Sequence, residues 1–349
     1  MAVSSDRLVV LITGTNSNLG VNLAYRFLET APREVRITLI VTSRTLPRAN
    51  EVIKEINDFN RTKLCRPGLL DFDYLLVDFT NMVSILAAYY ELIQRYDKID
   101  YLYVNAAQGV YDGIDWVGAA KEIATNPIEG VTQPHYKIQR VGVKSKDGLG
   151  LVFQANVFGP YYFIHKITKL LQDGGTIVWI SSIMSSPSYL SFNDLQLIRS
   201  TESYEGSKRL VDLLHLATYK KLLKQKGIRQ YVVQPGIFIS YSFGKVLNLI
   251  SYWGMILLFY VARWLGSPWH NISGYNAANS AITVSLLLDE KNFEQDVKYG
   301  SACDRSGKCY MVREQIDSTG CEDVLAYMEK LRNEWDELLK DQISDTRKL

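Results

Sequence analysis

Cysteine and histidine are scarce in this chain, which has four residues of each type among 349. The cysteines are too few and too scattered for a disulfide framework, so we expect free thiols in a reducing compartment. The histidines show no spacing typical of metal ligands, so we expect no metal site and a structural role for each of them. These residues are Cys65, Cys303, Cys309 and Cys321, and His135, His165, His215 and His270.

An excess of either charge is also missing, because the formal net charge is only +2. Nucleic-acid binding therefore has no electrostatic support, and we expect no nucleic-acid partner. A secretory signal peptide is not indicated either. The apolar run from Leu8 leads straight into a glycine-containing loop, so we expect a first strand there.

Short apolar runs alternate with helical patterns through the first two thirds of the chain. This alternation predicts an α/β fold of the Rossmann type, with a doubly wound parallel sheet and helices on both faces. The strands are nearly continuous in apolar character, as expected of a sheet that is covered on both faces. The expected strands are Leu8–Thr13, Val35–Thr42, Tyr74–Val77, Ile99–Val104, Thr176–Ser181 and Gln230–Val233, and the expected helices Leu19–Glu29, Ala49–Phe59, Met82–Arg95, Leu151–Leu171 and Tyr204–Lys226.

Two segments depart from this alternation. Tyr111–Gly150 is polar and contains Gly, Pro and Lys, so we expect a surface insertion. Val246–Ala262 has no charged residue and is followed by Trp264 and Trp269, which suits a membrane–water interface. A buried or oligomer-forming helix and a membrane span are the alternatives for it.

Val324–Leu339 has the period of an amphipathic helix. We expect one domain, with a catalytic part over 1–240, an apolar substrate-lid or membrane-contact segment over 241–270, and a C-terminal extension over 271–349.

The segment TGTNSNLG, Thr13–Gly20, follows the first strand and precedes a helix. This is the context of a pyrophosphate-binding loop, in which small residues let the anion approach the N–H groups at the start of the helix. An Asn, Asn18, stands where such loops usually have a middle glycine. Because Asn tolerates positive φ, we expect Asn18 to adopt it; a plain turn is the alternative to a cofactor loop.

The second strand ends in Thr42-Ser43-Arg44, with Arg48 close behind and no carboxylate. A dinucleotide site for NAD usually places an acidic residue here, whereas an Arg beside hydroxyl groups suits the 2′-phosphate of NADP. The sequence therefore favours NADP, unless Arg44 is a solvated loop charge.

Tyr204 and Lys208 are four residues apart, so they lie on one face of a helix. A cation near a phenol lowers its pKa, and a Tyr tuned in this way can protonate a developing alkoxide. The pair is preceded by Asn156 and by Ser181-Ser182 at a strand end, and is followed by Pro235-Gly236.

This ordered set, with Asp78 after the third strand and Asn105-Ala106-Ala107 after the fourth, resembles the short-chain dehydrogenase/reductase superfamily from about Arg7 to Ser240. The segments VTSRTLPRA, DFDYLLVDFTNMVS, YVNAAQGVYDGIDW, YEGSKRLVDLLHLATYK and GSPWHNISGYNAAN are similar to the fungal 3-keto-steroid reductases of ergosterol synthesis almost end to end.

The resemblance implies that NADPH reduces the C3 ketone of a 4-methyl-3-keto sterol to the 3β-alcohol. Tyr204 would protonate the oxyanion, Lys208 would depress the pKa of Tyr204 and bind the nicotinamide ribose, and Asn156 would hold a relay water. Ser182 would steady the carbonyl oxygen, with Ser181 as the alternative. The residues expected to bind the cofactor are Gly14, Asn18, Leu19, Gly20, Thr42, Ser43, Arg44, Arg48, Asp78, Asn105, Tyr204, Lys208, Gly236 and Ser240.

The resemblance also implies an endoplasmic reticulum membrane location on the cytosolic face, and lipid droplets. The implied partners are the enzymes of the C4-demethylation complex and the sterol-forming cyclase. The chain differs from the commoner members of the superfamily in Asn18, in Ala107-Gln108, and in the longer separation of Tyr204 from Ser182. The alternative functions are a membrane-bound NADP-binding scaffold and a reductase of another lipid ketone.

Overall fold

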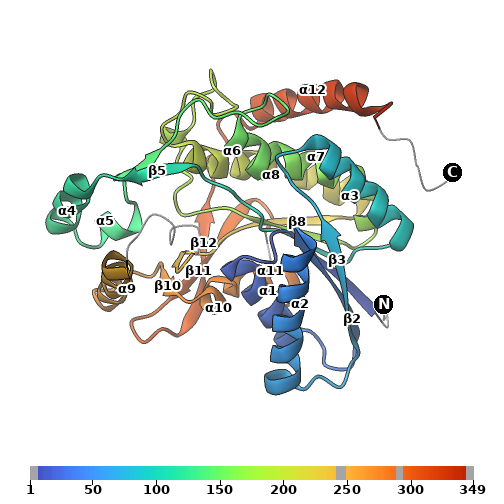
Figure 1. Cartoon of the computed structure of the whole chain (residues 1–349), viewed down its shortest axis with the longest axis horizontal. Helices are drawn as coiled ribbons and strands as arrows, with labels where there is room; N and C mark the ends of the chain where they lie inside the picture. The colour runs from blue at the N-terminus through green and yellow to red at the C-terminus, as the bar shows by residue number, and fades with distance from the viewer. Residues whose placement is uncertain (1–6, 241–248, 288–293, 343–349) are drawn as a thin grey trace.

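The computed structural model describes residues 7–240, 249–287 and 294–342. Its centre is an eight-stranded sheet in the order β12-β11-β8-β7-β4-β1-β2-β3 (Figure 1). All neighbouring strands are parallel except β11 and β12, which form an antiparallel hairpin at one edge. The strands are β1 (Arg7–Ile12), β2 (Arg36–Ser43), β3 (Leu70–Leu76), β4 (Tyr101–Val104), β7 (Thr176–Ile180), β8 (Arg229–Gln234), β11 (Val297–Cys303) and β12 (Cys309–Gln315).

Helices cover both faces of this sheet, as the strand–helix alternation predicts (Figure 1). One face packs against α1 (Asn18–Thr30), α2 (Leu46–Phe59) and α11 (Asn279–Leu286). The other packs against α3 (Met82–Arg95), α7 (Gly159–Leu171) and α8 (Ser203–Lys226), and α12 (Cys321–Leu339) lies over α8. The predicted Rossmann-type doubly wound fold with a C-terminal helix is confirmed.

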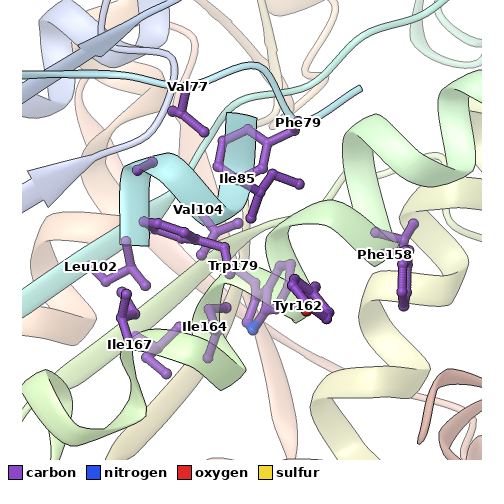
Figure 2. Packing of buried hydrophobic residues seen from close by; sticks show 14 of the residues in the cluster. Val77, Phe79, Ile85, Leu102, Val104, Phe158, Tyr162, Ile164, Ile167 and Trp179 are labelled. Carbon is purple, nitrogen blue, oxygen red and sulfur yellow. The ribbon is translucent and has the colours of Figure 1, made fainter. Parts of the chain in front are cut away.

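The core under α3 and α7 is built from apolar strand residues that meet apolar helix residues. Figure 2 shows Leu102 and Val104 of β4 and Trp179 of β7 beside Ile85 of α3 and Ile167 of α7. Burial of such side chains stabilises the fold by roughly 1.5–3 kcal/mol each. This packing fixes where β4 and β7 end, and therefore the edge of the sheet at which the polar candidates lie.

The insertion between β4 and the Asn156 helix is structured. It contains β5 (Tyr111–Ile114), α4 (Trp116–Thr125), α5 (Glu129–Thr132) and β6 (Lys137–Gln139), with β5 and β6 paired antiparallel. The predicted helix over 151–171 is a run of three segments: α6 (Leu151–Phe153), a π-helix η2 (Gln154–Phe158), and α7. The remaining elements are η1 (Asn60–Leu64), η3 (Pro187–Tyr189), β9 (Ile237–Phe238), β10 (His270–Ile272) and α10 (Gly274–Ala277).

Most of the apolar stretch near residue 250 forms α9 (Leu249–Trp264), while 246–248 lie outside the described residues. Phe259 and Ala262 are buried against Val131 of α5 and Ile272 of β10, and the other residues of the helix are at least partly exposed. The alternative of a buried helix is therefore wrong. Among the described residues, no helix combines the length and the apolar character needed to cross a bilayer.

Candidate functional site

The loop between β1 and α1 has the shape of an anion cradle. Gly14 has φ +62°, and a Cβ built on Gly20 would lie 2.4 Å from the carbonyl oxygen of Gly14. Ser17 caps the helix, since its hydroxyl accepts from the N–H of Gly20 at 3.0 Å. The N–H groups of Asn18 and Leu19 in the first turn have no acceptor within the helix, which is the usual basis of phosphate binding. The loop therefore fits a dinucleotide pyrophosphate.

Asn18 does not have the positive φ that the sequence led us to expect. It is the first residue of α1, and the left-handed conformation belongs to Gly14. The expectation failed because the helix begins one position after the Ser17 cap, so Asn18 is already helical. Its amide donates instead to the carbonyl oxygen of Ile239, which ties the loop to the segment after Pro235-Gly236. A Cβ on Gly274 would lie 2.5 Å from Asn18 Oδ1, so a glycine there leaves room for this amide.

Asn105 and Thr42 hold the loop in place. Asn105 Nδ2 donates to the carbonyl oxygens of Thr13 (2.9 Å) and Gly14 (3.0 Å) and to Ser17 Oγ (3.1 Å). Thr42 Oγ1 accepts from the Gly14 N–H at 2.7 Å, and Thr42 is buried. Both side chains are used in bonds to the protein, so they position the cradle.

The two arginines that follow β2 differ in their partners. Arg48 pairs with Glu51 at 2.7 Å, whereas Arg44 is exposed and makes no hydrogen bond or ion pair with any part of the chain that the structure describes. Ser43 is buried beside it. At the end of β3, Asp78 accepts from the N–H and hydroxyl of Thr80 and is partly exposed. Arg44 is thus the cation available to a ligand at this strand end.

Tyr204 and Lys208 lie one turn apart on α8, with Lys208 Nζ 5.6 Å from the centre of the Tyr204 ring. Lys208 Nζ also donates to the carbonyl oxygen of Ile180 at 2.8 Å. Burial lowers the pKa of Lys208 to about 8, against a smaller opposing effect of Asp212. The pKa of Tyr204 is raised by burial and by the Glu205 carboxylate, so the expected lowering by Lys208 is wrong.

The two candidate serines differ in exposure. Ser181 is buried, and its hydroxyl donates to the carbonyl oxygen of Lys208 at 3.4 Å. Ser182 is partly exposed, and its hydroxyl accepts from the Met184 N–H at 3.0 Å, which leaves its own proton to donate. The geometry therefore favours Ser182, and the choice between the two stays a prediction.

Asn156 lies in the π-helix η2, a conformation that often occurs at functional sites. Its amide exchanges two hydrogen bonds with the backbone of Gln108, at 2.7 and 2.9 Å, and donates to Ser207 Oγ at 2.9 Å. Asn156 thus connects the loop after β4 to Ser207 of α8, the residue before Lys208.

The Pro-Gly turn after β8 also has the conformation of a tight turn. Gly236 has φ +66°, and its N–H donates to Gln234 Oε1 at 2.7 Å. Ser240 is partly exposed at the last described position before 241–248. Leu19 is buried, so only its backbone is available to a cofactor.

A buried polar cluster that no sequence pattern indicates supports the Ser182 turn. Lys298 Nζ, from β11, donates to Asp212 Oδ2 (2.9 Å), Ser185 Oγ (2.7 Å) and the carbonyl oxygen of Ser182 (3.3 Å). Lys298 and Asp212 are 86 positions apart in the chain, so no local spacing could have connected them. No group of three potential metal-binding His, Cys, Asp or Glu side chains occurs in the described ranges.

The chain is similar to known proteins in its sequence and in its fold. A model of the short chain dehydrogenase family matches residues 8–246. The chain is 63% identical to a 3-keto-steroid reductase of Debaryomyces hansenii, over 97% of each chain. It is 61% identical to one of Saccharomyces cerevisiae, over 98% of this chain and 99% of the relative.

Solved structures share the fold at low identity. The Pseudomonas aeruginosa RhlG/NADP active-site complex is 15% identical, with a TM-score of 0.56 over 86% of this chain and 96% of that one. A 7α-hydroxysteroid dehydrogenase complexed with NADH and 7-oxo glycochenodeoxycholic acid is 17% identical, with a TM-score of 0.52 over 80% of this chain and 87% of that one.

Proposed function

The chain belongs to the short-chain dehydrogenases, as an oxidoreductase among the fungal 3-keto-steroid reductases, and from this premise we propose that it reduces the C3 ketone of 4-methyl-3-keto sterols with NADPH. The product is the 3β-alcohol, in ergosterol synthesis. The observation that carries the proposal is end-to-end similarity to proteins named 3-keto-steroid reductase, in a chain whose Tyr204 and Lys208 lie one turn apart on α8 and whose Asn156 bonds Ser207 between them.

The chain's own groups account for the proton and for the orientation of the ketone. Bound NADPH would supply the hydride that the C3 carbon takes up. Tyr204 donates its proton to the ketone oxygen, and its raised pKa keeps that proton in place at neutral pH. Ser182 donates a hydrogen bond to the same oxygen, which stabilises the charge that develops on it. Lys208, cationic below pH 8, adds a positive charge one turn away from Tyr204.

Arg44 supports NADPH over NADH as the preferred cofactor. It has no hydrogen-bond or ion-pair partner among the described residues, and no carboxylate follows β2 within the next three residues. An arginine binds a phosphate through charge-assisted hydrogen bonds, whereas a carboxylate here would bind ribose hydroxyl groups.

The test is NADPH oxidation in detergent with 4-methyl-3-keto sterols, 3-keto sterols without the methyl group, and simple ketones. Tyr204→Phe should lower kcat by at least about 10²-fold while NADPH binding persists, because only the proton donor is removed. Tyr310→Phe, an exposed tyrosine on β12, is the matched control and should keep full activity. Full activity of Tyr204→Phe would assign the proton transfer to another group. An inactive wild type would leave the NADP-binding scaffold, and activity only on simple lipid ketones would exclude the sterol.

We also propose that α9 rests on a lipid surface, where a sterol enters the site without crossing water. Exposed apolar residues recur along one side of the helix, at Ile250 (85% exposed), Trp253 (61%), Leu257 (64%) and Trp264 (78%). This spacing is that of a single helical face, and interfacial tryptophans are typical of helices that lie in a membrane surface. Trp116 and Val117 begin α4 at the same end of the molecule (Figure 1).

Flotation with phosphatidylcholine vesicles tests the lipid contact. Replacing Ile250, Trp253 and Leu257 with serine should abolish flotation, while Leu338→Ser, an equally exposed leucine on α12, should leave it unchanged. Unchanged flotation of the triple variant, with loss of a dimer instead, would assign this face to an oligomer contact. The endoplasmic reticulum, lipid droplets, the C4-demethylation enzymes and the sterol cyclase follow as the proposed location and partners. Fractionation and co-purification of the same variants test them.

A further inference from the structure

One glutamine of the insertion contacts three consecutive residues at the start of the helix that carries Tyr204. Gln139, the last residue of β6, accepts from Ser203 Oγ at 3.0 Å and from the Tyr204 N–H at 2.9 Å through its Oε1. Its Nε2 donates to Glu205 Oε2 at 2.5 Å. Gln139, Ser203 and Glu205 are all buried.

These bonds replace a cap that the helix does not make for itself. Glu202 precedes α8 and makes no side-chain capping bond. The N–H of Tyr204 in the first turn has no acceptor within the helix, and leaving such a buried group without a partner is costly. Gln139 supplies the acceptor from a distance of 65 positions in the chain.

The same glutamine fixes a buried carboxylate beside Tyr204. A buried carboxylate needs a hydrogen-bond donor, and Gln139 provides one for Glu205. The titratable groups that face Glu205 are Tyr204 on α8, Lys137 on β6, Tyr111 on β5 and Tyr189 on η3. A negative charge next to a phenol disfavours the phenolate.

We propose that Gln139 and Glu205 are positioning residues for Tyr204: the glutamine caps the start of α8 and holds the Glu205 carboxylate where it favours the protonated tyrosine. This inference rests on the proposed function, since the protonated tyrosine is the form that donates a proton to the ketone oxygen. It gives the insertion a role in the reaction, because β6 carries the residue that orients the proton donor.

Exchanging the glutamine and the glutamate between positions 139 and 205 tests the proposal. Gln139→Met should lower kcat for reduction between tenfold and about 10²-fold at unchanged KM for NADPH, because a misplaced proton donor slows the chemical step. Gln139→Glu alone should be similarly impaired, since two carboxylates would face each other. Gln139→Glu combined with Glu205→Gln restores a donor and an acceptor with exchanged roles, and should recover most of kcat. Ile138→Met, on the exposed side of β6, is the matched control.

The pH profile separates positioning from simple loss of folding. Oxidation of the 3β-alcohol requires the phenolate, so its kcat/KM rises with pH through the pKa of Tyr204. Glu205→Gln keeps the bond to Gln139 and removes the charge, so this rise should move to lower pH by about 1 unit. An unmoved profile in Glu205→Gln, or no recovery in the swap variant, would overturn the proposal.

Amide exchange gives a readout that needs no substrate. The N–H of Tyr204 should exchange faster in Gln139→Met than in the wild type and in Ile138→Met, measured by mass spectrometry of residues 201–208. If the wild type reduces no sterol ketone, the proposed function fails and exchange still judges the cap. If the wild type is active and Gln139→Met matches it in kcat and exchange, the positioning role fails alone.

Discussion

At the scale of single residues, two lysines in this site do different work because their surroundings differ. Lys208 is buried beside Tyr204 and the Ile180 carbonyl, and its pKa is lowered to about 8. Lys298 is buried in a pair with the Asp212 carboxylate. The charge of Lys208 therefore changes near pH 8, and the rate of reduction should follow it.

We expect kcat/KM for reduction to be constant below pH 8 and to fall by about tenfold per pH unit above it. The cation is the protonated form, present below the pKa and lost as pH rises through it, while Tyr204 keeps its proton over the same range. Lys208→Arg remains charged at these pH values, so its rate should be lower but without the alkaline fall. A fall at the same pH in Lys208→Arg would assign this ionisation to another group.

Arg44 and Arg48 form a second matched pair. Arg44→Ala should raise the KM for NADPH by roughly ten- to a hundredfold and leave that for NADH unchanged, because a charge-assisted bond to a phosphate is lost. Arg48→Ala removes a cation that already pairs with Glu51, so it should change neither value by more than about twofold. Steady-state assays with both cofactors measure this, and equal effects of the two variants would contradict the role given to Arg44.

At the scale of elements, the local sequence pattern predicted some helices and strands and missed others. The strand–helix alternation predicted β1, α3 and α8 nearly to their ends, because β1 is apolar on both of its buried faces and each helix packs apolar residues into the core. It missed β11 and β12, although the turn between them, Asp304–Lys308, contains Gly307 and is typical of a hairpin. It also predicted that Tyr204 and Lys208 lie one turn apart on a helix, which is confirmed. No spacing indicates that Gln139 accepts from the Tyr204 N–H or that Lys298 donates to Ser185.

Lys298 of β11 connects the C-terminal hairpin to the Ser182 turn and to Asp212 of α8. Lys298→Met should cost about 3–5 kcal/mol in the free energy of unfolding, because it leaves the Asp212 carboxylate buried without its cation. Adding Asp212→Asn should recover most of this stability. The double variant should nevertheless have a lower kcat than the wild type, since the carbonyl oxygen of Ser182 has lost its bond from Lys298. Urea unfolding and kcat measured together test both parts, and full activity of the double variant would contradict the second.

At the scale of the whole molecule, the sheet depends on chain segments far apart in the sequence. The match to the family ends at residue 246, yet β11 pairs with β8 and α12 packs against α8. His215 of α8 takes part in this junction, since its Nε2 contacts the carbonyl oxygen of Gln295, just before β11. Its ring also contacts Gln230 Nε2 of β8 through Nδ1 at 3.2 Å. His215 therefore contributes hydrogen bonds to this junction, and its side chain can accept a proton.

Acid should loosen this junction. In the neutral form Nε2–H donates to Gln295 and Nδ1 accepts from Gln230, whereas a second proton on Nδ1 would face the Gln230 donor. Burial accordingly lowers the pKa of His215 to about 4, below its unfolded value, so the unfolded chain binds more protons between these two values. Stability is then lost as pH falls through this window, by about 2 kcal/mol from pH 7 to pH 5. His270, also buried, has its pKa lowered to about 4 and adds to the loss.

Urea unfolding at pH 7 and pH 5 measures the difference. His215→Phe should be less stable than the wild type at pH 7 and should lose about 2 kcal/mol less on acidification, because the protonation site is gone. His135→Phe, at an exposed histidine beside Glu122, should keep the full acid loss of the wild type. An undiminished acid loss in His215→Phe would mean that the junction between α8 and β11 does not respond to pH. The sensitivity would then lie with His270 and the segment that leads from α9 back to the sheet.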